Sequence, residues 1–252
     1  MNAAIIYEVK DRIAFITINL PQSLNALNPQ SVEELGRAWV KFRDDEKALV
    51  AIITGAGEKS FCIGYEMSPE ALTIPNAKKA KLTVPTSFEI WKPVIAAING
   101  YCLAGGWYIA QECDIRVAAD EAQFGIPQVK WGLTTPISAS VESVLMPGHA
   151  LELLLVGNRI DAAKAYEIGF VNYLVHADQV MSKAIEIAKK ICDNGPIAVR
   201  KAKELFYRAR LLNEKDTDNL TWRLFEESKS SEDSQEGVRA FNEKQKPKFK
   251  GR

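Results

Sequence analysis

Residues 60–67 and 98–108 carry the pattern most able to do chemistry in this chain of 252 residues. Each segment includes or follows a strand-like apolar run and leaves it at glycine. In the second segment, Gly105 and Gly106 are placed to open a helix, whose first N–H groups lack an intrahelical partner and carry partial positive charge. Two such backbone donors aimed at one oxygen form an oxyanion hole, which stabilises negative charge that develops on a carbonyl.

At these residues the chain resembles the enoyl-CoA hydratase/isomerase, or crotonase, superfamily. The likeness runs from about residue 13 to residue 249, and it is supported by residues 24–28, 113–119, 122–125 and 162–171. The resemblance implies an α/β fold, a crotonase-like spiral of ββα units with a C-terminal helical region that forms trimers, often paired into hexamers. We therefore expect a spiral core over residues 1–195 and a helical oligomerisation region over residues 196–252.

The same resemblance implies that the partner is an acyl-CoA thioester, with the backbone N–H groups of Ile63 and Gly105 as the oxyanion donors. The residues expected to hold the thioester are Leu24, Ala26, Ile63, Gly64, Tyr65, Glu66 and Gly105. No metal or redox cofactor is implied, because coenzyme A belongs to the substrate. Trp107, Tyr108 and Trp131 are expected to line the acyl pocket, where bulky aromatic side chains shrink the space or favour a flat acyl group.

Two positions depart from the family pattern. Hydratases carry one glutamate early on the helix after the Gly-rich turn and a second just after the Phe-Gly-x-Pro segment, and the pair moves protons to and from one water. Here these positions hold Tyr108 and Gln128. An amide cannot exchange protons, and an unperturbed phenol, with a pKa of about 10, is a poor base at neutral pH. Hydration by the two-carboxylate route is therefore not expected.

Three glutamates are candidates to replace the missing acid and base. Glu66 occupies the position after the first oxyanion donor where the family usually has aspartate, and its expected role is to orient that loop. Glu112 lies one turn beyond Tyr108 on the same helix face. Glu142 is kept, with Tyr108 and Gln128, among the catalytic candidates.

The reaction itself stays open at this stage. Family membership favours a hydratase or isomerase type of activity, a lyase or isomerase acting on acyl-CoA. The missing glutamates favour decarboxylation, C–C bond hydrolysis or thioester hydrolysis. The alternative from another class is a non-catalytic acyl-CoA-binding subunit.

The composition gives no indication that the protein binds nucleic acid, spans a membrane or holds a metal or a disulfide framework. Lysine plus arginine equals aspartate plus glutamate, at 32 each, so no basic excess points to nucleic acid. No apolar run approaches the ~18 residues that a membrane span needs. The four cysteines form no C-x-x-C pair, so neither a metal site nor a disulfide framework is suggested, and a reducing cytoplasm is the expected location.

Periodicity predicts the elements that must position these residues. Strands are expected over residues 12–19, 49–54, 94–98 and 115–118. Asn28 and Pro29 predict a helix start, as its N-cap and first residue. Residues 69–85 are polar and predict a mobile loop or a short helix. Further helices are expected over residues 163–168, 179–193, 196–209, 218–228 and 233–243.

Overall fold

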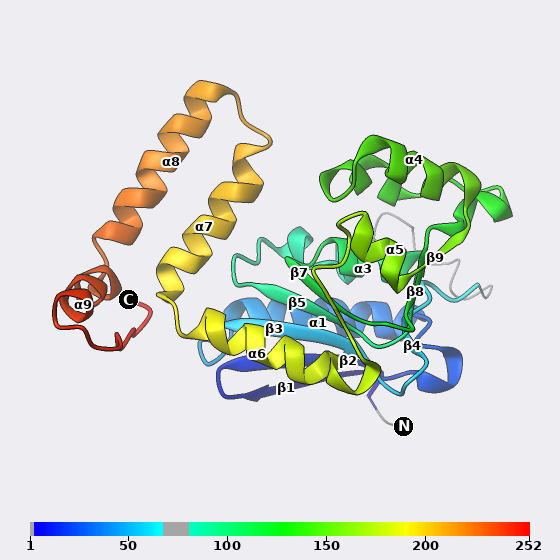
Figure 1. Ribbon diagram of the computed structural model, residues 1–252, viewed down its shortest axis with the longest axis horizontal. Coiled ribbons are helices and arrows are strands. Elements are labelled where there is room, and N and C mark those ends of the chain that lie inside the picture. Colours follow the sequence, from blue (N-terminus) through cyan, green and yellow to red (C-terminus); the bar gives the residue numbers. More distant parts are fainter. Residues whose placement is uncertain (1–2, 68–80) are drawn as a thin grey trace.

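A six-stranded sheet forms the centre of the computed structural model, which describes residues 3–67 and 81–252 (Figure 1). Its strands, in spatial order, are β1 (Ile5–Lys10), β2 (Ile13–Ile18), β3 (Val50–Gly55), β5 (Val94–Ile98), β7 (Ile115–Ala119) and β10 (Tyr173–Val175). The first pair is antiparallel and all other neighbours are parallel. The central strands β3, β5 and β7 are almost wholly buried, as is usual for parallel strands covered on both faces.

A smaller sheet of four short strands collects the segments that leave the large sheet. It contains β4 (Ser60–Cys62), β6 (Tyr101–Leu103), β8 (Gln123–Gly125) and β9 (Arg159–Asp161) in that order. In the chain, β3 leads to β4, β5 to β6 and β7 to β8, so three successive units step from one sheet to the other. Since β4, β6 and β8 are parallel, the ends of these units lie next to one another.

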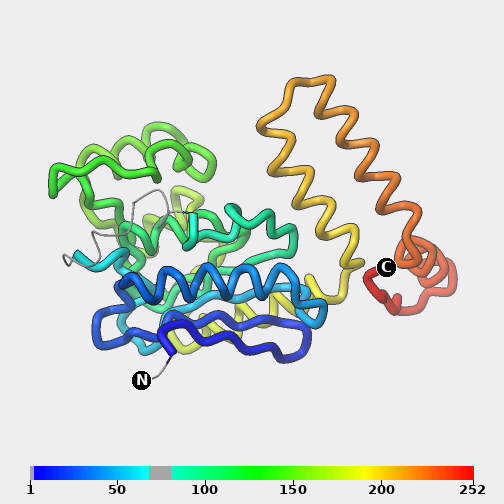
Figure 2. The backbone as a smooth tube through the Cα atoms, turned by 180° about the vertical axis from the view of Figure 1, so that it is seen from behind, coloured from blue at the N-terminus to red at the C-terminus, as the bar shows by residue number. Residues whose placement is uncertain are grey.

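Two longer helices pack on the large sheet. Helix α1 (Pro29–Asp44) begins where Asn28 caps it, since the Asn28 side chain accepts a hydrogen bond from the Ser31 N–H at 2.8 Å. Its buried residues include Trp39 and Phe42, and it lies against β1 and β2. Helix α6 (Val180–Cys192) packs against β3, β5 and β7. Figure 1 shows α6 nearer the viewer, and Figure 2, from behind, shows α1 nearer.

Shorter helices connect the strands around the smaller sheet. They are α3 (Gly105–Gln111), α4 (Pro147–Val156) and α5 (Ala162–Glu167). Between β8 and α4 the chain forms three 3₁₀ turns, Pro127–Trp131, Pro136–Ala139 and Val141–Ser143. Helix α4 packs on the first and third of these turns, and in Figure 1 it lies at the upper right, above α3 and α5.

The C-terminal helices form an arm that projects from the body of the molecule. Helices α7 (Pro196–Ala209) and α8 (Glu214–Lys229) run antiparallel as a hairpin, and α9 (Glu232–Asn242) lies at its base near the C-terminus (Figures 1 and 2). Several large apolar side chains of the arm are exposed: Phe206, Leu211, Trp222, Phe225, Val238 and Phe241.

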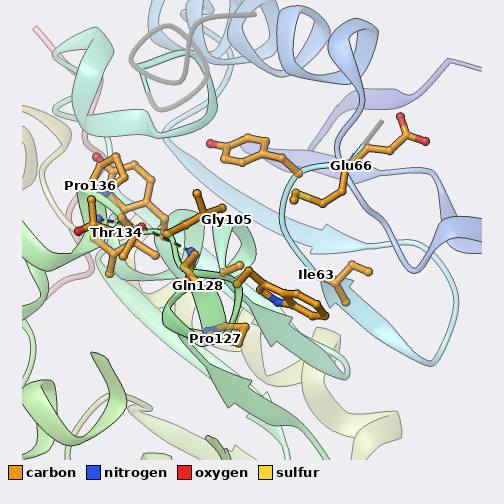
Figure 3. A pocket seen from close by; sticks show the side chains of 15 residues that line it. Ile63, Glu66, Gly105, Pro127, Gln128, Thr134 and Pro136 are labelled. Atoms are coloured by element: carbon orange, nitrogen blue, oxygen red, sulfur yellow. Dashed lines mark hydrogen bonds between the residues drawn. The ribbon is translucent and has the colours of Figure 1, made fainter. Parts of the chain in front are cut away.

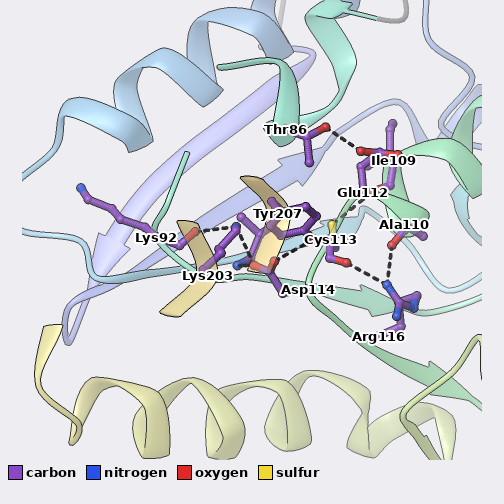
Figure 4. Close-up of polar contacts among 11 residues, drawn as sticks. Thr86, Lys92, Ile109, Ala110, Glu112, Cys113, Asp114, Arg116, Lys203 and Tyr207 are labelled. Atoms are coloured by element: carbon purple, nitrogen blue, oxygen red, sulfur yellow. Dashed lines mark hydrogen bonds and ion pairs between the residues drawn. The ribbon is translucent and has the colours of Figure 1, made fainter. Parts of the chain in front are cut away.

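The Asp114 carboxylate is one of the groups that join the arm to the core (Figure 4). Asp114 Oδ2 accepts from Lys203 Nζ at 2.7 Å, and Asp114 Oδ1 accepts from the Tyr207 hydroxyl at 3.1 Å. The same Asp114 Oδ2 accepts from the Val94 N–H at 2.7 Å, where β5 begins. The Lys203 ammonium also donates to the Lys92 carbonyl at 2.9 Å. Helix α7 is therefore fixed to the start of the strand that leads into residues 98–108.

The α/β architecture and the C-terminal helices confirm the predicted fold class. The strands predicted over residues 12–19, 49–54, 94–98 and 115–118 are β2, β3, β5 and β7, and the five predicted C-terminal helices are present with shifts of a few residues. Strand β1 and helix α4 were not predicted. The polar stretch 69–85 lies largely outside the described residues. Among the described residues, no helix is long and apolar enough to cross a membrane.

Candidate active site

The two glycine-containing segments meet at the edge of the smaller sheet. After β4, the loop at Gly64 is held by Leu27, whose N–H donates to the Gly64 carbonyl at 2.8 Å and whose carbonyl accepts from the Glu66 N–H at 2.9 Å. Gly64 has a positive φ of 104°, and a Cβ built on it would lie 2.9 Å from the Gly105 nitrogen. Gly64 therefore lies directly beside the first residue of α3.

Glycine is required at the start of α3 because the helix touches the end of β4. A Cβ built on Gly106 would lie 2.0 Å from the Cys62 carbonyl oxygen, closer than real Cβ contacts come. A Cβ on Gly105 would lie 3.1 Å from Gly64 Cα and 3.2 Å from a ring carbon of Tyr65. Glycines at these two positions bring the helix N-terminus close to the Ile63–Gly64 backbone.

Asn25 fixes the neighbouring loop, in which Leu24 and Ala26 lie. Its side chain is buried, donates to the carbonyls of Ala56 (3.0 Å) and Ser60 (2.7 Å), and accepts from the Leu20 N–H at 2.9 Å. The Ser60 hydroxyl in turn donates to the Leu24 carbonyl at 2.8 Å. Leu24 thus supports the start of the first segment, and neither Leu24 nor Ala26 lines the cavity described next.

A cavity of about 510 Å³ opens beside Gly105 (Figure 3), and we call it the Gly105 cavity. It brings together Ile63, Gly105, Tyr108 and Gln128, four of the five residues predicted to be catalytic. The predicted pocket residue Trp131 also lines it. The full described lining is Ile63, Tyr65, Glu66, Met67, Ala104, Gly105, Tyr108, Pro127, Gln128, Trp131, Leu133, Thr134, Thr135, Pro136 and Ile137.

Two predicted residues lie elsewhere. Glu142 is exposed and, with Glu112, lines a separate cavity of about 660 Å³ against helix α7, so the structure does not bring it to Gly105. The Glu112 carboxylate accepts from the Thr86 hydroxyl at 2.6 Å. The expectation that Trp107 lines the acyl pocket is wrong. Trp107 is fully buried and stacks on Phe170, with ring centroids 3.8 Å apart, because α3 turns this side chain into the core.

The polar groups of the Gly105 cavity are few. Gln128 Nε2 donates to the Thr135 hydroxyl at 3.4 Å, whereas Gln128 Oε1 is buried without a hydrogen-bond partner among the described residues. The Tyr65 hydroxyl lies 2.8 Å from the Thr83 hydroxyl. Glu66 is the only charged side chain in the described lining, and Figure 3 shows its carboxylate directed away from Gly105 and Gln128.

Burial keeps both cavity tyrosines protonated. Desolvation, and to a lesser extent the nearby Glu112 carboxylate, raises the pKa of Tyr108 above its ordinary value of 10. Desolvation likewise raises the pKa of Tyr65, against an opposing hydrogen bond from Thr83. At neutral pH each phenol can donate a hydrogen bond, and neither acts as a base.

Sequence reasoning missed several wall residues. Leu133, Thr134, Thr135 and Ile137 come from a loop and a short 3₁₀ turn, which have no periodicity to place them. Thr135 carried one usable signal, since it precedes Pro136 as an N-cap does, and its hydroxyl accepts from the Ile137 N–H at 3.3 Å. In the described residues, no group of three or more His, Cys, Asp or Glu side chains gathers as a metal would require.

The chain belongs to the enoyl-CoA hydratase/isomerase (crotonase) family, whose model, described as enoyl-CoA hydratase/isomerase, matches residues 8–252. It is 37% identical over 249 residues to the short-chain-enoyl-CoA hydratase of Clostridium acetobutylicum, covering 96% of this chain and 95% of that one. It is 33% identical over 251 residues to the (E)-benzylidenesuccinyl-CoA hydratase of Thauera aromatica, covering 97% and 98%. Among solved structures, enoyl-CoA hydratase from Bacillus anthracis superposes with a TM-score of 0.91 at 32% identity, covering 99% of this chain and all of that one.

Proposed function

We propose that the protein is an enzyme that binds an acyl-CoA thioester and stabilises a thioester enolate with the backbone N–H groups of Ile63 and Gly105. The observation that carries the proposal is that both residues line one cavity, with the N-terminus of α3 beside the Gly64 loop. Charge developing on the thioester oxygen would gain two fixed donors that need no rearrangement during the reaction. Coenzyme A is part of the substrate, and no resident metal or redox cofactor is proposed.

The acid and base chemistry differs, in this proposal, from the two-glutamate route. Tyr108 is a phenol with a raised pKa, so it can donate a hydrogen bond or a proton to the reacting group. Gln128 can orient a water or a hydroxyl group through its amide but cannot take its proton. Such a site suits reactions in which enolate stabilisation or an ordered water is sufficient, namely decarboxylation, C–C cleavage or thioester hydrolysis. Glu66 is the one described carboxylate in the lining that could serve as a base after a change of rotamer.

Assembly and location are part of the proposal. Exposed apolar side chains on α8 and α9, such as Trp222 and Phe241, support an oligomerisation region over residues 196–252 and a homotrimer or hexamer. The four cysteines are buried and free in the structure, in keeping with a reducing cytoplasm.

Mass spectrometry of the reaction products tests the function directly. The protein is incubated with a panel of enoyl-, malonyl- and aryl-CoA thioesters, and each thioester is followed by its mass. At least one should be converted. Gly105→Val keeps the backbone N–H, but its side chain would crowd Gly64 and Tyr65 and displace that donor, so conversion should slow by about 10²–10³-fold, as when one oxyanion donor is lost. Gly148→Val is the matched control, because a Cβ at Gly148 meets no atom within 4 Å.

The same experiment, combined with calorimetry, distinguishes an enzyme from a non-catalytic acyl-CoA-binding subunit. If calorimetry shows that acyl-CoA binds while no thioester in the panel is converted, the protein is a non-catalytic acyl-CoA-binding subunit. If Gly105→Val binds and converts the thioester as the unmodified protein does, the oxyanion assignment is wrong.

A further inference from the structure

We propose that the acyl group bound in the Gly105 cavity carries an aromatic ring and a hydroxyl group, and no carboxylate of its own. The inference rests on the proposed function, since it names the substrate class of the same site. Three features of the described walls carry it: the aromatic side chains, the buried Oε1 of Gln128 that lacks a hydrogen-bond partner among the described residues, and the distribution of charge.

Aromatic side chains and prolines make up a third of the fifteen described lining residues. Tyr65, Tyr108 and Trp131 supply three rings, and Pro127 and Pro136 add two more flat surfaces. Trp131 is 75% exposed, so a ligand ring seated against it removes apolar surface from water. Aromatic pairs also gain from stacked or edge contacts beyond the area that they bury. An alkyl chain of the same size makes no such contacts, and it has more rotors to immobilise.

The amide of Gln128 favours a ligand with a polar group that can form a hydrogen bond to it. Its Oε1 is buried with no partner among the described residues, and its Nε2 makes a single long hydrogen bond to Thr135. A buried polar atom without a partner is destabilising, and a ligand that pairs with it relieves that penalty. A hydroxyl group both donates and accepts, so it pairs with this amide in either orientation of its oxygen and nitrogen.

The charges of the cavity argue against a carboxylate on the acyl group, and therefore, among the reactions proposed above, against decarboxylation and in favour of C–C cleavage or thioester hydrolysis. No lysine or arginine is present among the described residues that line the cavity, and Glu66 is the one charged side chain. A carboxylate moved into these walls would lose its hydration without gaining a cation, and it would be repelled by Glu66.

Isothermal titration calorimetry with five synthetic thioesters tests the inference on the unmodified protein. Nonanoyl-CoA and 3-phenylpropanoyl-CoA have acyl groups with the same number of carbon atoms and differ in the ring. Two hydroxylated forms, 3-(4-hydroxyphenyl)propanoyl-CoA and 3-hydroxy-3-phenylpropanoyl-CoA, place the hydroxyl on the ring or on the chain. The fifth, 3-(4-carboxyphenyl)propanoyl-CoA, adds a carboxylate.

The expected order follows from the walls. The phenyl thioester should bind about 3- to 10-fold tighter than nonanoyl-CoA. At least one hydroxylated thioester should bind about 3- to 10-fold tighter than its parent. The carboxylated thioester should bind at least ~10-fold more weakly than the parent. Gln128→Met should abolish the hydroxyl preference and keep the ring preference, whereas Trp131→Leu should do the reverse, so each variant is the control for the other.

Each failure has its own meaning. If none of the five thioesters binds, the proposed function fails with the inference. If they bind but nonanoyl-CoA is equal to or tighter than the phenyl thioester, the aromatic inference is overturned while acyl-CoA binding stands. If neither hydroxylated thioester gains affinity, or if the gain survives in Gln128→Met, the hydroxyl inference is overturned. Equal affinity for the carboxylated thioester refutes the charge argument.

Discussion

Replacing Gly106 with alanine should separate the two proposed oxyanion donors. The new Cβ would start 2.0 Å from the Cys62 carbonyl oxygen, and real Cβ atoms essentially never come closer than 3.0 Å to a neighbour. The start of α3 and the end of β4 must therefore move apart by at least 1.0 Å, the difference between these two distances. Backbone atoms cannot rotate away as a flexible side chain can, so the displacement passes to the adjacent Gly105 N–H.

The expected magnitude follows from that displacement. A misplacement of 1 Å in a catalytic geometry lowers turnover by about 10²-fold. Forcing an extra methyl group into a packed site also lowers the free energy of unfolding, by about 1–3 kcal/mol. Turnover is measured on the thioester that mass spectrometry identifies, and stability is measured by urea denaturation, so the two effects are obtained separately.

A matched substitution controls for alanine itself. Gly148→Ala adds the same methyl group near the start of α4, where no atom lies within 4 Å, and both turnover and stability should stay close to those of the unmodified protein. If Gly106→Ala retains full turnover and full stability, the contact between α3 and β4 is not as tight as described, and the argument for paired donors fails with it.

Four further results are expected. Because the pKa of Tyr108 is raised above 10, the phenol keeps its proton at all lower pH. The pH profile of kcat/KM should therefore show a fall caused by loss of this proton only above pH 10, and Tyr108→Phe should remove that fall. Hydration of crotonyl-CoA, followed by loss of enoyl absorbance, should be slow and should rise by at least ~10²-fold in the double variant Tyr108→Glu with Gln128→Glu; hundreds of turnovers per second in the unmodified protein would refute this. Asp114→Asn should lower the free energy of unfolding, measured by urea denaturation, by about 3–5 kcal/mol, because it leaves the largely buried Lys203 ammonium without its anion. Glu186→Gln is the control, since Glu186 forms only exposed ion pairs and its loss should change the free energy little. Equal effects of the two substitutions would show that the Asp114–Lys203 pair does not anchor the arm. Light scattering at micromolar concentration should give a multiple of the 28.0 kDa chain, and a monomer mass would end the oligomer proposal.

Local signals were sufficient for much of the fold. Asn28 followed by Pro29 predicts the start of α1, because both the cap and the first helical residue act within one turn, and the structure shows the capping bond to Ser31. Buried parallel strands are continuous apolar runs, so β3 and β5 were found from sequence. Strand β1 was missed. It lies at the sheet edge, where four of its six residues are exposed and the apolar signal is weaker.

The parts of the site formed by backbone groups were predictable from the sequence. The directions of the side chains around them were less predictable. Gly105 and Gly106 mark close backbone approaches, and such constraints are visible in sequence as glycine. The inward turn of Trp107 depends on Phe170, a long-range contact that no local pattern reports. Glu142 lies in a series of short 3₁₀ turns, and these lack the period that would tell an inward face from an outward one.

The three hydrogen bonds to Asp114 make the direction of the C-terminal arm a property of the core. The carboxylate joins Lys203 of α7 to the Val94 N–H at the start of β5, so the arm leaves the body at an angle fixed inside the protomer. That angle determines where Trp222 and Phe225 are presented to a neighbouring molecule. In an oligomer that assembles through the arm, the symmetry would then depend on Asp114, a residue remote from the subunit interface. A substitution at Asp114 would change the quaternary geometry without altering any interface residue.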